Sequence, residues 1–194
     1  MRTSILVTLI HTVTILFFTS CRSYHVSLTY TPPLKGNPAT SDSSLLRVGR
    51  VNDSREIQGT QIGTIRNEFG IPIKSLHAKR PVAQIAHNAF TYALKLRNRS
   101  PGNKPKYTIS ADILELWCHQ YATLSADCRV RINVYQTKTK QLVFSREYQA
   151  NRSGQTLKVT YWSNVEDLAA VMSETLQSVV DSALDDPDFQ QIVR

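Results

Sequence analysis

Apolar and polar residues alternate along three neighbouring segments in the second half of the chain. Between residues 122 and 134 every even position is apolar and every odd position is polar. This two-residue period predicts a strand with one buried and one wet face. Residues 107–118 alternate too, but the parity shifts after Ile113, which predicts a β-bulge there. Residues 142–148 predict a third strand with three side chains turned inward, namely Leu142, Phe144 and Tyr148.

Two longer segments show the helical period instead. After Pro81, apolar residues recur at helical spacing until the chain reaches Ser100-Pro101-Gly102, which predicts a helix. The second helix begins with a capping box formed by Ser163 and Glu166. Its apolar stripe ends near residues 185–187, and we expect a short turn around residues 189–192.

The first half of the chain has a weaker pattern. Alternation predicts strands over residues 24–30 and 45–51, separated by a segment rich in proline, serine and glycine. Residues 49–70 hold four of the seven glycines, which favours a turn and an irregular loop. The glycines lack the spacing of a phosphate-binding loop, so we expect no nucleotide site.

This order of elements predicts an α+β fold. It is a two-layer sandwich, with a mainly antiparallel sheet and two long helices packed on one face. We expect a single domain over residues 45–194, because this length suffices for one hydrophobic core.

The N-terminus is typical of an exported protein. Residues 1–20 combine a positive start with an apolar stretch too short to span a membrane, as in a signal peptide. Phe-Thr-Ser-Cys at residues 18–21 resembles a bacterial lipobox, although Phe18 replaces the usual leucine. We therefore expect lipidation (palmitate) at Cys21, followed by a flexible linker over residues 21–44. A plain secretory signal or an uncleaved anchor stays open. Under the lipoprotein rule, Arg22 after the cysteine implies the outer membrane, facing the periplasm.

The charge of the chain favours an acidic partner. Lysine and arginine number 23 against 15 aspartates and glutamates, a formal net charge of +8. Because export removes the chain from nucleic acids, the partners left are anionic lipid or glycolipid, cell-wall polymer, or an acidic envelope protein.

Two more cysteines lie on facing segments of the predicted meander. Cys118 and Cys128 both fall on the inward parity, which makes a cross-strand disulfide geometrically feasible. Two buried, unpaired thiols are the alternative. The sequence lacks the ligand spacing of a metal site, and we expect no metal and no cofactor.

We find no catalytic constellation, and we expect no enzyme. The histidines are scattered and no nucleophile motif is present. Asp53 and Arg55 lie two positions apart at a strand end, where Asp53 is expected to cap a turn and Arg55 to cover a sheet edge. A binding role for the pair is the alternative.

The segment from residue 51 to residue 70 resembles the YajG-type family of uncharacterised bacterial lipoproteins. That family has a V-x-D-x-R strand end followed by I-G and N-x-x-G, and the matching residues here are Val51, Asp53, Arg55, Ile62, Gly63, Asn67 and Gly70. The resemblance spans about residues 45–193. It implies an outer-membrane lipoprotein facing the periplasm, with no established enzymatic activity.

These observations lead to two functional hypotheses. The first is a lipid-anchored, non-enzymatic domain that binds another envelope component, preferably a protein, through the polar sheet face or the glycine-rich loop. The second is an accessory subunit of an envelope machine that transports or assembles lipid or polysaccharide, in which the basic patches meet anionic head groups. The oligomeric state does not follow from the sequence.

Overall fold

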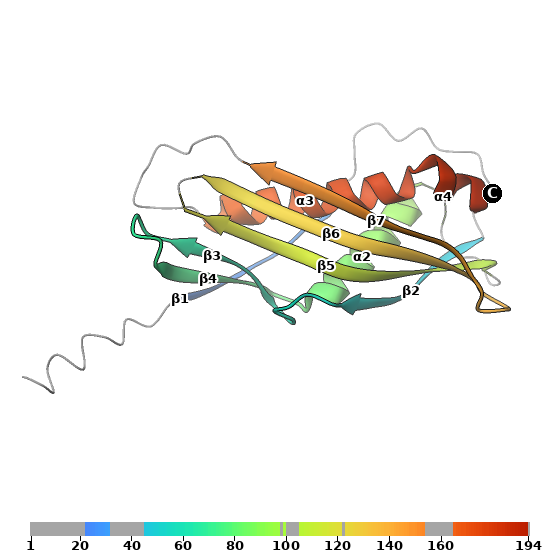
Figure 1. Ribbon diagram of the computed structural model, residues 1–194, viewed down its shortest axis with the longest axis horizontal. Helices are drawn as coiled ribbons and strands as arrows, with labels where there is room; N and C mark the ends of the chain where they lie inside the picture. The colour runs from blue at the N-terminus through green and yellow to red at the C-terminus, as the bar shows by residue number, and fades with distance from the viewer. Residues whose placement is uncertain are drawn as a thin grey trace, which may run out of the picture.

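The computed structural model describes residues 22–31, 45–97, 99, 105–121, 123–153 and 165–193. They form one mixed seven-stranded sheet with helices on one face (Figure 1). This confirms the α+β sandwich. The longest strand pairs are antiparallel, and three shorter parallel pairs make the sheet mixed.

The predicted meander is formed by β5 (Tyr107–Gln120), β6 (Leu124–Gln136) and β7 (Leu142–Ser153). The register between β5 and β6 shifts between Ile113 and Glu115, which confirms the bulge. The prediction for Leu142 is wrong, because its side chain is 49% exposed. A second register shift beside Tyr135 displaces the start of β7, so parity no longer carries Leu142 to the core side.

The first half of the chain contributes four strands. They are β1 (Arg22–Val26), β2 (Leu46–Asp53), β3 (Gln61–Arg66) and β4 (Pro72–Ala78). The irregular loop predicted up to residue 70 is therefore wrong over β3, which pairs antiparallel with β4. The strand predicted over residues 24–30 begins and ends earlier, at Arg22–Val26, and residues 32–44 of the predicted linker lie outside the described part.

The strand order is β1-β4-β3-β5-β6-β7, and β2 also pairs with β5. Two strands therefore share one edge of β5. β2 lies beside residues 107–113, and β3 lies beside residues 118–120. Between them, residues 114–117 of β5 have no strand partner on that edge. The loop of residues 54–60 connects β2 to β3 across this gap.

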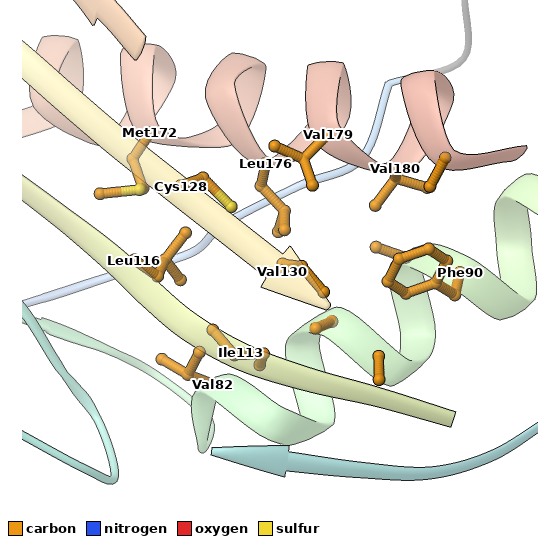
Figure 2. Close-up of a cluster of buried hydrophobic side chains, with 14 of the residues drawn as sticks. Val82, Phe90, Ile113, Leu116, Cys128, Val130, Met172, Leu176, Val179 and Val180 are labelled. Carbon is orange, nitrogen blue, oxygen red and sulfur yellow. The ribbon is translucent and has the colours of Figure 1, made fainter. Parts of the chain in front are cut away.

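Both long helices pack on the same face of the sheet. They are α2 (Val82–Leu96) and α3 (Val165–Leu184), and the short α4 (Pro187–Ile192) follows. Figure 2 shows Met172, Leu176 and Val179 of α3 directed toward the strands, with Phe90 of α2 beside them. This confirms both predicted apolar stripes. Ser163 of the predicted capping box lies outside the described residues.

Residues 27–31, here called the N-terminal strap, leave β1 and cross to the helices. The Thr29 N–H donates a hydrogen bond to Ser173 Oγ of α3 at 3.2 Å. The Tyr30 ring meets Tyr92 of α2 edge to face, and its hydroxyl donates to Asp181 of α3. The chain after Arg22 is thus held by both the sheet and the helices.

Candidate interaction surface

The sheet face opposite the helices carries a row of polar side chains. Asp112 of β5 accepts hydrogen bonds from Asn52 of β2 at 2.7 Å and from Asn133 of β6 at 3.0 Å. Ser145 of β7 donates in turn to the Asn133 side-chain oxygen at 2.8 Å. These bonds cross four strands and hold the side chains in fixed positions. The predicted wet face is confirmed.

Charged residues extend the same face. Arg131 of β6 forms an ion pair with Glu147 of β7, and Arg129 lies 3.8 Å from Glu115 of β5. All four side chains are exposed, so each pair stabilises the fold by about 1 kcal/mol at most. The face is therefore polar and solvated, and its charges are available to a partner.

A hollow interrupts this face next to the bulge in β5. Its volume is about 450 Å³, and its lining includes Ile57, Leu114 and Trp117, with Glu115 and Arg129 at the charged part. Ile57 belongs to the loop that crosses the gap between β2 and β3, and it is exposed. Trp117 points outward because its neighbours Leu116 and Cys118 are buried. Tryptophan and arginine, which both line this hollow, are among the side chains most enriched at protein-binding hot spots.

Asp53 and Arg55 build the floor of this region. Arg55 is 5% exposed, and its Nε and Nη2 donate to the two Asp53 carboxylate oxygens at 2.7 and 2.9 Å. The remaining donors of Arg55 reach backbone carbonyl oxygens of Gly59, Gln61 and Leu116. Leu116 lies in the part of β5 that lacks a strand partner, so the guanidinium replaces the missing backbone donors there.

The Asp53 carboxylate is stabilised in its charged form. Burial alone would raise its pKa, but hydrogen bonds from Arg55 and from the Gly59 N–H, together with the charge of Arg55, bring the pKa below its ordinary value. Asp53 therefore caps the turn and Arg55 covers the sheet edge, as the sequence predicts. With its donors used within the fold, Arg55 has a structural role.

The other motif residues are structural as well. At Gly63 of β3, a Cβ atom would lie 2.2 Å from the Cys118 carbonyl oxygen and 2.5 Å from its sulfur. Only glycine lets β3 approach β5 at this point. The Asn67 side-chain oxygen accepts the N–H groups of Phe69 and Ile71 at 3.0 and 2.9 Å, and Gly70 has a φ of 76°. Asn67 and Gly70 thus fix the turn between β3 and β4.

Cys118 and Cys128 are both buried, as the parity predicts, and both are free thiols. In the strand register Cys118 faces Ala126 and Cys128 faces Leu116, so the two cysteines are diagonal neighbours. Diagonal positions are about 7–8 Å apart, whereas a disulfide needs Cβ atoms about 4 Å apart. The structure thus supports the alternative of two buried thiols. Burial raises the pKa of each thiol to about 12.

The described residues contain no group of histidine, cysteine, aspartate or glutamate side chains that could hold a metal ion. His25 and His77 stack on adjacent strands, and His119 contacts Ser125 across β5 and β6. Among the described helices, none is long and apolar enough to cross a membrane. Cys21, the predicted lipidation site, lies just outside the described part.

Sequence reasoning missed the hollow at Trp117. The tryptophan has an outward parity on β5, which is an unusual place for the largest apolar side chain and was the available signal. Ile57 carried no such signal, because its position depends on how the loop crosses the gap between two strands that pair with the same edge.

Solved structures of low sequence identity share this fold. Protein XCC0632 from Xanthomonas campestris, of the DUF330 family, is 15% identical, with a TM-score of 0.59 over 88% of this chain and 92% of that one. A second crystal structure, of an uncharacterized protein, is 10% identical, with a TM-score of 0.54 over 89% and 99% of the two chains. These identities show the fold alone.

A more distant neighbour is a protein of Caulobacter crescentus CB15 described as a candidate lipoprotein. It is 9% identical, with a TM-score of 0.41 over 57% of this chain and 82% of that one, which is too weak to support an argument. No protein-family model matches this chain, and no curated protein matches its sequence. None of the three structures carries the YajG name, so that resemblance rests on the sequence motif.

Proposed function

We propose that this chain is a non-enzymatic lipoprotein of the outer membrane, of the YajG type, anchored through Cys21 and facing the periplasm. There it binds another protein of the cell envelope through the polar sheet face, with the hollow at Trp117 as the centre of the contact. The hollow is the observation that carries the binding part of the proposal. The lipobox-like residues 18–21 carry the anchoring part.

The hollow has the composition of a protein-binding centre. Ile57, Leu114 and Trp117 offer apolar surface, and the lining also holds two charged residues of each sign, namely Arg55, Arg129, Glu56 and Glu115. Protein interfaces combine such an apolar centre with a polar rim. The fixed hydrogen bonds along Asp112 and Asn133 keep the surrounding face in one arrangement, which lowers the entropy lost on binding.

The anchoring part agrees with the position of β1. Arg22, the residue directly after Cys21, already belongs to the edge strand of the sheet. An acylated Cys21 would therefore hold the domain close to the bilayer. Several acyl chains anchor a protein stably where one would not.

Crosslinking in living cells tests the binding part. A photoreactive amino acid replaces Ile57 at the rim of the hollow, and in a control chain it replaces Glu147 on the same face. We expect position 57 to capture one protein species at both low and high salt, and Trp117→Ala to abolish the capture. Because Trp117 points away from the core, Trp117→Ala should keep the urea midpoint close to that of the wild type.

Three results would contradict this proposal. Equal capture at positions 57 and 147, or capture that survives Trp117→Ala, would remove the hollow from the contact. Capture of an anionic glycolipid that disappears at high salt would favour the accessory-subunit alternative. If Cys21→Ser protein still fractionates with the outer membrane, lipid at Cys21 is not what localises the chain.

A further inference from the structure

Exposed apolar side chains gather at one end of the sheet. Of the nine large apolar side chains that are exposed in the described part, four lie there: Phe69 (76% exposed), Ile71 (57%), Ile73 (43%) and Tyr121 (55%). Single exposed apolar residues are ordinary, but a cluster marks a contact surface. This cluster, here called the hairpin patch, consists of the β3–β4 turn and the neighbouring end of β5.

The hairpin patch is held in a fixed shape. The Asn67 side chain accepts the backbone N–H groups of Phe69 and Ile71, and the Arg66 guanidinium donates to the Gly70 carbonyl oxygen at 2.8 Å. The Tyr121 hydroxyl donates to the Glu68 carbonyl oxygen at 3.3 Å, which joins the end of β5 to the turn. Phe69 is therefore exposed to solvent on a turn that several hydrogen bonds hold in one conformation.

The same end of the sheet is where the N-terminus leaves. In the parallel pair of β1 and β4, Arg22 lies opposite Lys74. Lys74 is three residues after Ile71, about 10 Å along the strand. Figure 1 shows the start of β1 and the β3–β4 turn at the same end of the molecule, on the left. Cys21 is joined directly to Arg22, so an acyl chain on Cys21 would start beside the hairpin patch.

The charge at this end fits a phospholipid surface. Arg22, Arg66 and Lys74 are basic, and Glu68 is the acidic residue of the turn. The Lys74 ammonium lies 5.2 Å from the centre of the Tyr24 ring. Aromatic and aliphatic tips flanked by lysine and arginine are the side chains that enter the interface of a bilayer, where their basic groups meet phosphates.

We propose that the hairpin patch is a second membrane contact, in which Phe69 and Ile71 enter the head-group region beside the lipid on Cys21. The inference rests on the proposed lipid anchor for the orientation of the domain. The lipid on Cys21 and the hairpin patch would hold the same end of the sheet at the bilayer, so that the sheet extends away from the membrane. The hollow at Trp117 then faces the periplasm from the side of the molecule.

Photocrosslinking of the full chain in cells with radiolabelled phospholipids tests this contact. The replacements are Phe69→benzoylphenylalanine and, as matched control, Leu142→benzoylphenylalanine, because Leu142 is also apolar and 49% exposed but lies at the opposite end of the sheet. We expect the variant with the photoreactive group at position 69 to carry labelled phospholipid. The variant with the group at position 142 should carry none. A third variant carries the photoreactive group at position 121. Adding Phe69→Ser and Ile71→Ser to this variant should reduce the amount of phospholipid that it captures.

Radiolabelled palmitate in parallel cultures that are not irradiated separates the two proposals, because the label on the chain then reports acylation and not a crosslinked phospholipid. Palmitate on the chain without phospholipid at position 69 would overturn the second contact and leave the anchor. Phospholipid at position 69 without palmitate would overturn the anchor and support the contact. If position 69 instead captures a second copy of the chain or another protein, the hairpin patch is a protein interface and the membrane contact is wrong.

Discussion

Arg55 replaces part of a missing strand. Its guanidinium donates to Gln61 and Leu116 carbonyl oxygens where β5 has lost a strand partner, and Asp53 holds it in place. The planar guanidinium holds several N–H donors in fixed directions, so it can reach the Asp53 carboxylate and the backbone carbonyl oxygens at once. The compact ammonium group of a lysine could not do this. The residues that suggest a family likeness therefore explain how the chain folds.

Replacing Arg55 by alanine should destabilise the domain strongly. The change leaves the Asp53 carboxylate and three carbonyl oxygens without their donor, and the breaking of such a buried pair costs about 3 kcal/mol or more. The urea midpoint of Cys21→Ser protein, with and without Arg55→Ala, measures the loss. Arg131→Ala is the matched control, since its exposed pair with Glu147 contributes about 1 kcal/mol at most. Equal midpoints for the two variants would contradict the assigned role.

The same pair gives stability a pH dependence. The pKa of Asp53 is lower in the folded chain than in the unfolded one. Its contribution is thus complete above the unfolded value, about 4, and is lost as the pH falls through the lower folded value. Asp53→Asn should flatten the acid side of the stability profile.

Single residues were partly predictable from the sequence. The cap at Asp53 depends on neighbours a few positions away, so local reasoning found it, whereas the sheet edge that Arg55 covers includes Leu116, 61 positions away. The need for Gly63 depends on Cys118, which is far away in sequence and meets it only in the folded sheet. For a related reason, the sequence predicted that Cys118 and Cys128 are buried but left open whether they form a disulfide, because parity gives the face of a strand but not its register.

At the scale of elements, the long helices and the meander were predictable because each keeps one periodicity for many residues. β3 and β4 were not. β3 contains Gly63, required by close packing against β5, and the same glycine suggests a loop when read locally. β4 begins with residues that are exposed at the sheet end, so Leu76 and Ala78 alone carry its buried face. Two isolated positions give no clear period.

Two carboxylates connect the C-terminal helix α4 to β7, since Asp186 and Asp188 both accept hydrogen bonds from Arg146. Asp186 caps α4 by accepting the N–H groups of Asp188 and Phe189 at 2.8 and 3.2 Å. It also accepts hydrogen bonds from Arg146 at 2.6 Å and from the Tyr148 hydroxyl at 2.8 Å, both on β7. Burial alone would raise the pKa of Asp186, but these donors bring it below its ordinary value. Phe189 is buried behind this contact.

Asp186→Ala should release α4 without unfolding the sheet. The lost cap costs about 1 kcal/mol, and the half-buried Tyr148 hydroxyl loses its acceptor, while Arg146 keeps its ion pair with Asp188. Hydrogen exchange of the amides of residues 188–192 should accelerate well beyond that of β6. Asp186→Asn keeps an oxygen for the cap, so its acceleration should be smaller. If both variants accelerate exchange across β6 as well, α4 is part of the global unfolding unit.

For the whole molecule, the two ends of the sheet differ. One end carries the hairpin patch and the start of β1, and the other carries the β6–β7 turn. The sequence predicts an anchor at Cys21, and the structure exposes Phe69 on the β3–β4 turn. Their proximity follows from the parallel pairing of β1 with β4, which crosses about fifty residues and leaves no local signal.

A longer tether should weaken the membrane contact. Inserting about 20 glycine and serine residues between Cys21 and Arg22 allows the domain to move roughly 25 Å from its lipid. Phospholipid crosslinking at position 69 should fall, while palmitate labelling and capture of the protein partner at position 57 should persist. Unchanged crosslinking would mean that the hairpin patch binds the bilayer by its own affinity and needs no help from the anchor.

The parallel pairing of β1 with β4 also has a mechanical consequence. If Cys21 is fixed in a bilayer, a partner that pulls the domain outward stretches the chain along the axis of β1. The force then acts on all hydrogen bonds between Arg22–Val26 and β4 at once, in shear, and not on one bond after another. Beyond β1, Tyr30 with Asp181 and Arg97 transfers the remaining load to both helices. The strand nearest the lipid is thus oriented to resist extraction of the domain.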